Sequence, residues 1–479
     1  MSKTIIIIGA GLAGLSAALQ AAENGCNVKL VSSLPSERAQ SVMAEGGINA
    51  ALNTKDENDS PEEHFTDTIK AACGLADPNA VWGMTQAAPE LVHWLLKLGV
   101  KFNMSGYDDV DLRNFGGQKK KRTAFAQSDT GKQIMTAMID AVRRKEASGM
   151  VERFSHHSFL TLRLCGNICC GCVIRDEYSQ ETVELPGDAV IVATGGMHGL
   201  FGNTTGSLSN TGEVTAELFR LGVPLANGEM IQYHPTTVKC GGKRMLISEA
   251  ARGEGGRLFA MKDGKQWYFM EEKYPELGNL MPRDITAREI WKVSHESEVF
   301  LDMTEISEEI ISNKLSGLAD DCMTYLHKDI RKEPVSVLPG IHYFMGGILV
   351  DEQHRTPIQN LYAAGECCAQ YHGANRLGGN SLLGALYGGR VAAKSACEQA
   401  DVVDLSCATQ IDFPPASQIS EIKQLNKVMQ ETMGVVRNEN TLLNGIQTVQ
   451  ALTGNLPLLG MAVLKSALAR KESRGAHWR

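Results

Sequence analysis

The feature that most constrains the fold is a run of β-branched residues near the N-terminus that leads directly into a glycine-rich turn. Thr4 to Ile8 is an apolar run typical of a buried parallel strand. Gly9-Ala10-Gly11-Leu12-Ala13-Gly14 follows at once, and the next residues are rich in Ala and Leu, as in a helix. Gly9 would permit the tight turn, Gly11 the approach of a pyrophosphate, and Gly14 the packing of helix on strand. Because such a helix N-terminus attracts phosphate, we expect a dinucleotide site here.

The ends of three predicted strands narrow the choice of dinucleotide. The second strand, Asn27 to Val31, ends in Ser32-Ser33, where an NAD site has an acidic residue for the ribose. Two further apolar strands, Asp188 to Ala193 and Leu361 to Ala364, end in glycine turns at Thr194-Gly195 and Gly365-Glu366. Several such strand ends at one sheet suit a large, two-part cofactor that lies across it. The sequence therefore predicts FAD.

Length and composition bound the remaining possibilities. With 479 residues, the chain is long enough for two or three domains. A net charge of −8 argues against nucleic acid as a partner. We see no signal peptide, twin-Arg leader or apolar run of membrane-spanning length, so we expect a cytoplasmic protein with reduced thiols and no direct membrane insertion.

The densest group of the 12 cysteines is Cys165, Cys169, Cys170 and Cys172. Its spacing fits neither a paired C-x-x-C zinc site nor a ferredoxin run. The group also falls in a predicted β-hairpin with Gly166-Asn167 at the turn. We therefore expect partly buried thiols and no metal site.

Several separate motifs together resemble the flavoprotein subunit of succinate dehydrogenase and fumarate reductase, and its relative L-aspartate oxidase. The likeness runs from about Thr4 to Arg479. In chain order the motifs are Ala44-Glu45-Gly46-Gly47-Ile48, Phe115-Gly116-Gly117, Asp129-Thr130-Gly131, His234-Pro235-Thr236, Glu249-Ala250-Ala251-Arg252-Gly253, Pro282-Arg283-Asp284, His342-Tyr343-Phe344-Met345-Gly346-Gly347, and His372-Gly373-Ala374-Asn375-Arg376 before Asn380-Ser381-Leu382.

The resemblance implies an α/β fold in several parts. A Rossmann-like FAD-binding domain, residues 1–235 and 341–400, is interrupted by an α+β capping domain at 236–340. A helical domain follows at 410–479, with helices from Ser417 to Ala469 broken at Gly434 and near Gly454. It is truncated relative to the family, because the chain ends at Arg479 where members continue for tens of residues. Closure of such a cap would exclude water from the site.

The resemblance also implies a site for a dicarboxylate. Reduction of a C=C bond between carboxylates requires a hydride, which flavin supplies, and cations that hold both carboxylates. The implied substrate-binding residues are His234, Ser248, His342 and Arg376, with Phe115 beside them. His234, His342 and Arg376 lie in stretches punctuated by Gly or Pro, so we expect them in loops. Arg376 offers a planar fork that meets a carboxylate bidentately.

The proton for the second carbon comes, in the family, from the residue that matches Arg283. A free arginine has a pKa above 12, so the lost proton must be replaced from behind. The resemblance assigns that relay to Glu249 and Arg252. Their spacing of three residues places both on one face if the segment is helical.

Contacts to FAD are implied at both ends of the cofactor. Glu366 is expected to bind ribose hydroxyls, and the helix that begins at Asn380 is expected to stabilise negative charge on the reduced ring. The predicted cofactor-binding residues are Gly9, Gly11, Gly14, Ser32, Ala44, Gly46, Gly47, Thr194, Gly195, Glu213, Glu366, Arg376, Ser381 and Leu382.

Two positions depart from the family pattern. Gln40 stands six residues before Gly46, where many members have a His bonded covalently to flavin. Gln cannot form that bond, so we expect noncovalent FAD and a bias towards fumarate reduction. The motif Thr-Gly-Asp-Gly is replaced by Thr211-Gly212-Glu213-Val214, which makes the contacts of Glu213 less defined.

Three functional readings remain open. The first is a fumarate reductase or succinate dehydrogenase flavoprotein with an iron–sulfur partner, held through partner subunits at the cytoplasmic face of the membrane. The second is L-aspartate oxidase, which has a Glu that meets the amino group of aspartate at the position where this chain has Phe115. Without that Glu, the ammonium of bound aspartate would be unpaired. The third is a non-catalytic electron relay. We favour an unsubstituted C4 dicarboxylate, with another α,β-unsaturated carboxylate as a further alternative.

Overall fold

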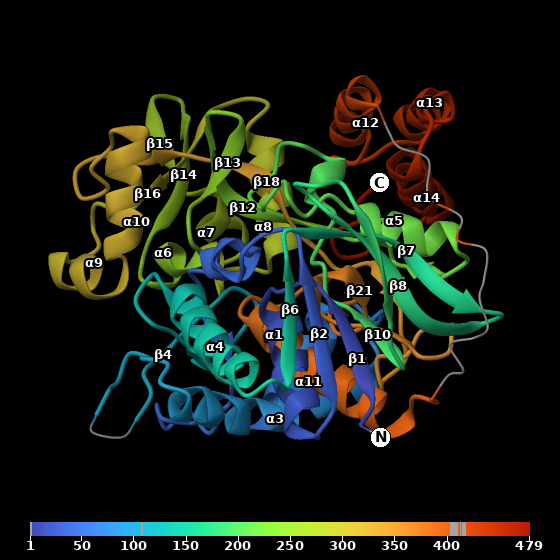
Figure 1. Cartoon of the computed structure of the whole chain (residues 1–479). Helices are drawn as coiled ribbons and strands as arrows, with labels where there is room; N and C mark the ends of the chain where they lie inside the picture. Colours follow the sequence, from blue (N-terminus) through green and yellow to red (C-terminus); the bar gives the residue numbers. More distant parts are fainter. Residues whose placement is uncertain (1, 107–108, 403–410, 412, 414–417) are drawn as a thin grey trace.

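A five-stranded parallel sheet forms the centre of the computed structural model, which describes residues 2–106, 109–402, 411, 413 and 418–479. The strand order is β20-β10-β1-β2-β6, and Figure 1 labels the last four of these strands. All four pairs of neighbours run parallel, so the prediction of a parallel sheet that joins the three sequence-distant strands is confirmed. The strands span Leu361–Ala363 (β20), Ala189–Val192 (β10), Thr4–Ile8 (β1), Asn27–Ser32 (β2) and Val151–Ser155 (β6).

The two faces of this sheet are covered by different layers. Ile5 and Ile7 of β1 pack into a core with helices α1 (Leu12–Glu23) and α11 (Asn380–Gln399). Ile6 and Ile8 point the other way, into a core that includes strands β7 (His157–Cys165), β8 (Ile168–Asp176) and β9 (Thr182–Pro186). A strand buried on both faces cannot alternate apolar with polar residues, which explains the unbroken apolar run at the N-terminus.

Further helices and short strands surround the same sheet. The longest are α3 (Pro78–Lys97) and α4 (Thr130–Ala147), which both contribute to the core beneath α1. The others are α2 (Pro61–Ala71), α5 (Glu213–Arg220), β3 (Ile48–Asn49), β4 (Leu112–Arg113), β5 (Thr123–Ala124), β11 (Leu225–Ala226), β19 (Gly347–Leu349), β21 (Cys368–Ala369), and the short helical turns η1 (Ser36–Arg38), η2 (Gln40–Met43), η3 (His198–Leu200) and η6 (Gly365–Cys367).

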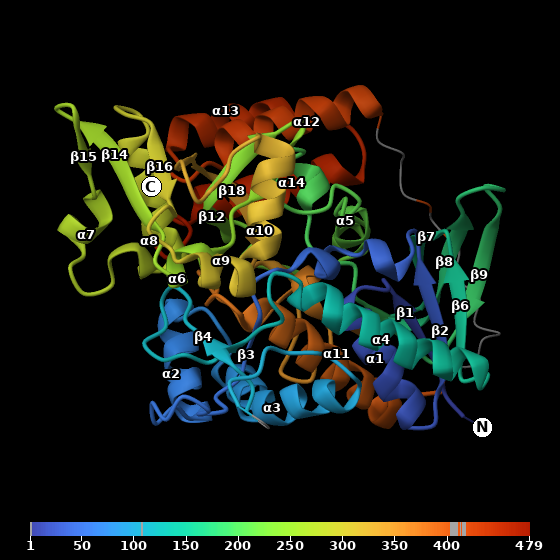
Figure 2. The same ribbon diagram turned by 90° about the vertical axis from the view of Figure 1, so that its left-hand side faces the viewer.

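The chain leaves and re-enters this part of the molecule along two paired strands. β12 (Ile231–Cys240) and β18 (Leu338–Phe344) run antiparallel, and β13 (Lys243–Leu246) extends the pair. The residues between them form a second hydrophobic core, away from the five-stranded sheet (Figure 2). This segment holds α6 (Glu249–Gly253), β14 (Arg257–Lys262), β15 (Lys265–Trp267), α7 (Phe269–Lys273), η4 (Gly278–Leu280), α8 (Arg283–Val293), β16 (Val299–Asp302), α9 (Glu308–Lys314), α10 (Ser316–Asp321), η5 (Cys322–Leu326) and β17 (Val335–Ser336).

Three helices close the chain: α12 (Ile419–Thr432), α13 (Glu439–Val449) and α14 (Asn455–Ala469). The predicted break at Gly434 is present, and Gly454 is the residue that precedes α14. Pro457 lies inside the first turn of α14, where its missing N–H costs no hydrogen bond. The predicted start of this region at 410 and 417 lies outside the described residues. Within those residues, no helix is long and apolar enough to cross a membrane.

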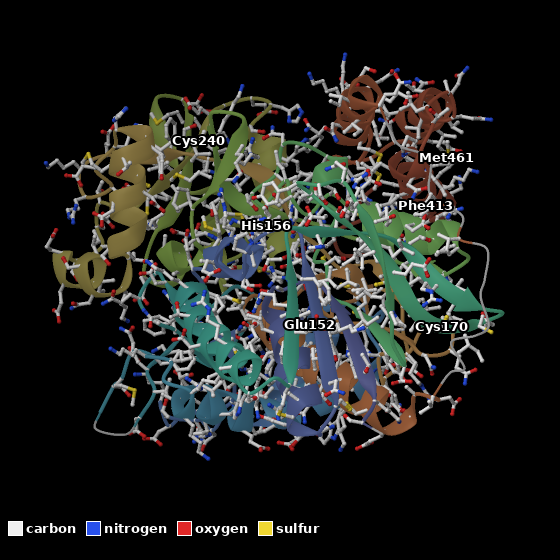
Figure 3. The ribbon with its side chains drawn as sticks, in the orientation of Figure 1. Glu152, His156, Cys170, Cys240, Phe413 and Met461 are labelled. Atoms are coloured by element: carbon white, nitrogen blue, oxygen red, sulfur yellow. The ribbon has the colours of Figure 1, made fainter. Side chains whose placement is uncertain are left out.

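The predicted cysteine hairpin is present, with Gly166-Asn167 between β7 and β8. Cys169 is buried in the core below it, and burial raises the pKa of its thiol to about 12. Cys165 is disulfide-bonded, so the prediction of uniformly reduced thiols is wrong at that position. The described residues contain no group of three or more His, Cys, Asp or Glu arranged to hold a metal ion. Cys170, labelled in Figure 3, lies on β8 at the side of the molecule.

Candidate active site

One cavity of about 1290 Å³ joins the glycine turn after β1 to the paired strands β12 and β18. Of the predicted site residues, only Gly14 and Arg252 do not line it: Gly14 packs under the turn, and Arg252 lies behind Glu249. The lining residues among those predicted are Gly9, Gly11, Ser32, Ala44, Gly46, Gly47, Phe115, Thr194, Gly195, Glu213, His234, Ser248, Glu249, Arg283, His342, Glu366, Arg376, Ser381 and Leu382. His156, near the centre of Figure 3, also lines it, just past the end of β6.

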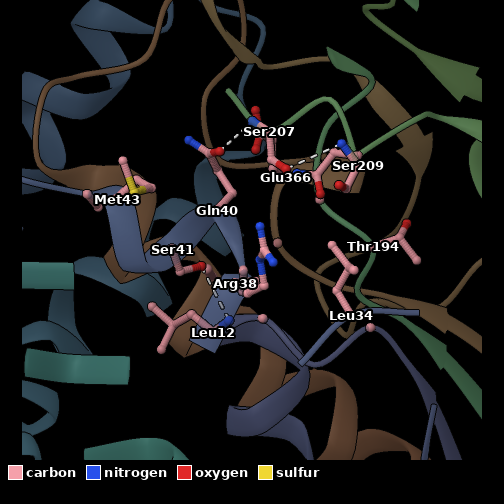
Figure 4. Close-up of a pocket in the computed structure, with 18 of the residues that line it drawn as sticks. Leu12, Leu34, Arg38, Gln40, Ser41, Met43, Thr194, Ser207, Ser209 and Glu366 are labelled. Carbon is pink, nitrogen blue, oxygen red and sulfur yellow. Dashed lines mark hydrogen bonds between the residues drawn. The ribbon is translucent and has the colours of Figure 1, made fainter. Parts of the chain in front are cut away.

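The glycine turn has the geometry that a dinucleotide needs. Gly9 has φ +111°, and a Cβ there would lie 2.3 Å from the carbonyl oxygen of Ala193. No side chain caps the N-terminus of α1, and its Leu12 N–H has only a long contact of 3.4 Å to the Ser41 hydroxyl (Figure 4). The buried hydroxyl of Ser32 also lacks a hydrogen-bond partner among the described residues. These free donors fit the pyrophosphate and ribose of FAD.

A second uncapped helix reaches the cavity from the other side. The N-terminus of α11 follows Gly379 and has no side-chain cap, while Ser381 and Leu382 line the cavity. The Asn380 side chain points into a buried network, where its amide donates to Thr68 and its carbonyl accepts from Asn49. The start of α11 is thereby fixed: the Asn380 N–H donates to the Leu377 carbonyl, and the next two residues of the uncapped helix lie at the cavity, where its dipole favours an anionic ring.

Two of the predicted cofactor-binding residues are carboxylates, Glu366 and Glu213. Glu366 accepts a hydrogen bond within the protein, and Glu213 has a raised pKa. Glu366 accepts a hydrogen bond from the Phe344 N–H at 3.1 Å and lies 3.6 Å from His198 Nε2. Glu213 begins α5, where burial and then the nearby Glu217 raise its pKa. Both line the cavity beside Thr194. Their contacts to the cofactor stay predictions.

Gln40 lies on the wall of the same cavity, within η2. Its side-chain carbonyl accepts a hydrogen bond of 2.6 Å from the Ser207 N–H, as Figure 4 shows. The amide thus joins two segments of the cavity wall and offers no nucleophile to a flavin. This contact is consistent with the prediction of a noncovalent cofactor.

The opposite end of the cavity is built from buried cationic and imidazole side chains. His234 on β12 and His342 on β18 have ring centroids 5.1 Å apart. The guanidinium of Arg376 lies 4.2 Å from the centre of the Tyr343 ring. His234 and Arg376 are only 1% and 2% exposed. These side chains converge on one wall, as a dicarboxylate site requires.

The prediction that His234 and His342 lie in loops is wrong, because both belong to strands. The pairing of β12 with β18 shifts register between Gln232 and Tyr233 and again between His234 and Thr237. These irregularities, one of them at Pro235, remove the alternation by which a strand is recognised. Arg376 does lie outside the helices and strands, but it is buried rather than exposed.

Burial keeps both imidazoles neutral. It lowers the pKa of His234 well below 6.5, and the charge of Arg283 lowers it further. The pKa of His342 is lowered in the same way, by burial first and then by His234 and Arg283. Burial and then Arg283 lower the pKa of Arg376 to about 9. A buried guanidinium whose charge is disfavoured by a second guanidinium nearby fits a dianionic ligand.

Arg283, the first residue of α8, is held by Glu249. The Glu249 Oε2 accepts from Nε at 2.8 Å and from Nη2 at 2.6 Å. Its Oε1 accepts from Arg252 Nη2 at 3.1 Å, which confirms that the predicted relay pair shares one face of α6. Burial raises the pKa of Glu249, but Arg283 and Arg252 outweigh it and leave that pKa below its usual value. The three side chains form a continuous buried chain of charges.

Gln232 and Asn375 are site residues that the sequence analysis missed. Gln232 accepts from Arg283 Nη1 at 3.1 Å and donates to the Asn375 side-chain carbonyl at 3.0 Å and to the Arg376 carbonyl at 2.8 Å. Asn375 in turn donates to Asp284 at 3.0 Å. No local pattern pointed to Gln232, because its partners Arg283 and Asn375 lie 51 and 143 residues away in the chain.

Glu45 is a further missed residue, within a motif of which only Ala44, Gly46 and Gly47 were predicted to bind the cofactor. Its Oε2 is shielded and has no hydrogen-bond partner among the described residues. Burial, and then the charge of Asp321, raises its pKa to about 8, so it is largely uncharged at pH 7. The hydroxyl of Ser248 interacts with it and also caps α6 through the Ala250 N–H. Phe115 is 1% exposed and lines the cavity.

Comparison with known proteins identifies relatives over the whole chain. Residues 4–382 match the family described as FAD binding domain, and residues 453–479 match that described as fumarate reductase flavoprotein C-term. The chain is 38% identical to the succinate dehydrogenase flavoprotein subunit of Bacillus subtilis, over 100% of its own length and 91% of that protein. It is 35% identical to the L-aspartate oxidase of Caulobacter vibrioides, over 99% and 92%. The FrdA chain of an E. coli quinol fumarate reductase superposes with a TM-score of 0.90 at 27% identity, over 100% of this chain and 91% of that one.

Proposed function

Because the chain belongs to the FAD-dependent oxidoreductase family of succinate dehydrogenase and fumarate reductase flavoproteins and L-aspartate oxidases, we propose that it interconverts fumarate and succinate. One observation carries this proposal. Arg283 and Arg376 are buried on the same cavity wall as the neutral imidazoles of His234 and His342. This set of donors suits two carboxylates held at a fixed separation.

The residues bind and orient the substrate. FAD supplies the hydride for one of the two unsaturated carbons. Arg376 meets one carboxylate with its planar fork, and His234, His342 and Ser248 donate hydrogen bonds to carboxylate oxygens. The aromatic face of Tyr343 under the Arg376 guanidinium keeps that fork in place. Fixed donors in a water-poor site stabilise charge without reorganisation during the reaction.

Arg283 donates a proton from its guanidinium to the second carbon. The proton is replaced through Glu249, which contacts Arg283 and Arg252 through different oxygens. Because the Glu249 carboxylate is shared by two cations, either guanidinium can lose a proton without leaving an uncompensated buried anion. In the direction of succinate oxidation the same chain removes the proton.

The surroundings of the site favour an unsubstituted dicarboxylate over aspartate. An ammonium group would need a carboxylate partner in this buried site. Phe115 provides none, and the nearby Glu45 is largely protonated at pH 7 because its pKa is about 8. L-Aspartate oxidase, the name of three of the relatives, is therefore the second candidate. A reductase of another α,β-unsaturated carboxylate is the third.

Several wider features belong to the same proposal. Residues 236–340 act as a cap that closes on the FAD-binding part, since they have their own hydrophobic core and carry Arg283 and Glu249. FAD is held without a covalent bond, because Gln40 replaces the histidine. Electrons reach the flavin from an iron–sulfur subunit, which also places the chain at the cytoplasmic face of a membrane.

An anaerobic experiment with the purified holoprotein separates the candidates. The oxidised protein is mixed with succinate or with aspartate, and the reduced protein is mixed with fumarate, while flavin absorbance is followed. We expect fumarate to reoxidise the flavin and succinate to bleach it faster than aspartate does. Rapid bleaching by aspartate without bleaching by succinate would refute the proposal and establish the oxidase.

A further inference from the structure

We propose that Thr205 positions His342 for substrate binding by donating its hydroxyl proton to Nδ1, which leaves Nε2–H as the donor for a carboxylate. This inference rests on the proposed function and adds to it a residue that fixes the tautomer of the imidazole. Thr205 lies between η3 and α5, and both Thr205 and His342 line the cavity.

The geometry ties the two side chains together. The Thr205 Oγ1 lies 2.8 Å from His342 Nδ1. The backbone N–H of Thr205 donates to the Ile341 carbonyl at 3.0 Å, which fixes this loop against β18. That same carbonyl is the only other acceptor near the hydroxyl among the described residues, and at 3.4 Å it is much the longer contact. The imidazole nitrogen is therefore the better acceptor for the Thr205 proton.

The chemistry of a neutral imidazole makes this contact consequential. His342 is neutral at pH 7, since burial holds its pKa well below 6.5. A neutral imidazole carries one N–H and one lone pair, and a carboxylate can accept only from the N–H. If Nδ1 carried the proton, the lone pair of Nε2 would meet the carboxylate and repel it. His342 Nε2 makes no hydrogen bond to any described residue, so it is free for substrate.

His234 shows why Thr205 has a separate role. The Nδ1 of His234 contacts the backbone N–H and carbonyl of Thr236, at 3.3 Å and 3.1 Å. The hydrogen bonding of His234 Nδ1 is therefore set mainly by backbone groups, which a side-chain substitution does not remove. At His342 the partner of Nδ1 is a single side-chain hydroxyl, that of Thr205. One substitution can therefore remove the contact that fixes the tautomer of His342.

A matched pair of variants tests the proposal in the flavin-loaded protein. Thr205→Val keeps the shape and removes the hydroxyl, whereas Thr205→Ser keeps the hydroxyl. The probe is malonate, a dicarboxylate that cannot be reduced, and its binding is followed by the change in flavin absorbance. We expect Thr205→Val to weaken malonate binding about tenfold and Thr205→Ser to restore it to within about twofold. Equal affinity in Thr205→Val and the wild type would overturn the proposal.

A double-mutant cycle distinguishes positioning from general damage. In a His342→Ala background there is no imidazole to orient, so Thr205→Val should cause no further loss of malonate affinity. The same tenfold loss in that background would show that Thr205 acts elsewhere and would also overturn the proposal. Flavin content should be equal in all four proteins.

The tautomer can also be read without any substrate. In protein labelled with ¹⁵N-histidine, the His342 signals are those that disappear in His342→Ala. We expect the Nε2–H form in the wild type and a shift towards Nδ1–H in Thr205→Val; an Nδ1–H form in the wild type refutes the role of Thr205. Should the wild type neither bind malonate nor reduce fumarate, the proposed function fails while this readout still decides the tautomer.

Discussion

The two ends of the cavity are suited to negative charge by different means. The FAD end uses backbone groups: the turn at Gly9 and the uncapped N-termini of α1 and α11. The proposed dicarboxylate end is lined by buried side chains, chiefly Arg283, Arg376 and the two histidines. Helix ends carry partial charges that need no compensation, whereas a buried guanidinium must be paired. Cofactor binding at the FAD end should therefore be sensitive to changes of backbone conformation and less sensitive to side-chain substitutions. At the other end, binding should be sensitive chiefly to side-chain substitutions.

The largest expected effect is at the side-chain end. Arg283→Lys replaces the fork that holds Glu249 with a single ammonium, so we expect fumarate turnover to fall by about 10³-fold or more while flavin content is unchanged. Turnover is measured anaerobically with a reduced dye. Arg288→Lys, on the same helix but against Trp478, is the control and should retain turnover. Turnover near the wild-type level in Arg283→Lys would exclude it as the acid.

The backbone end is tested by a single methyl group. In Gly9→Ala the added Cβ would meet the Ala193 carbonyl at 2.3 Å, at a φ that side chains rarely adopt. We expect loss of most bound FAD and a destabilisation of about 2–4 kcal/mol, measured by flavin content and urea unfolding. Gly242→Ala, where nothing lies within 4 Å, serves as the control. Full flavin content in Gly9→Ala would show that FAD binding does not depend on the backbone conformation of this turn.

Loss of the Gln232 side chain, which contacts both Arg283 and the backbone of Arg376, should reduce turnover less than loss of Arg283 itself. Gln232→Leu leaves Arg283 Nη1 and the Asn375 carbonyl without their partner. We expect kcat for fumarate to fall about 10- to 100-fold, with FAD content unchanged. Steady-state kinetics at several fumarate concentrations would show whether kcat or only KM changes. A change in KM alone would limit Gln232 to substrate binding.

Glu45 should reveal itself through the pH dependence of stability. Its pKa in the folded protein, about 8, lies above the ordinary value of 4.5, so folding favours the protonated form. The stability present below pH 4.5 is then lost as the pH rises towards 8. Glu45→Gln removes this dependence, and we expect it to be more stable than the wild type by roughly 1–3 kcal/mol at pH 9 but not at pH 4. Parallel urea curves at both pH values test this.

The smallest effect concerns Gln40. Acid precipitation of the purified protein should leave a colourless pellet and release all FAD into the supernatant, because an amide forms no bond to flavin. Flavin retained in the washed pellet would contradict noncovalent binding. This test also sharpens the comparison, since it shows that backbone contacts suffice at the FAD end.

Prediction from the sequence succeeded where the relevant residues are close together in the chain. The turn after β1, the cysteine hairpin of β7 and β8, and the Glu249–Arg252 pair each depend on residues within one short stretch of the chain. It failed for the secondary structure of His234 and His342, since bulges hide the strand alternation. It also missed Gln232 and Thr205, whose partners lie far away in sequence.

The sequence by itself determined the nucleotide-binding turn, the parallel sheet and the family, because each depends on local periodicity or on motifs with fixed spacing. Only the tertiary structure decided that Gln232 and Thr205 join the arginines and histidines already named at the proposed dicarboxylate end. There β12, β18, α6, α8 and the segment before α11 converge, and their burial sets the charges of His234, His342 and Glu45. Desolvation and the field of distant charges depend on packing in three dimensions, and no window of sequence contains them.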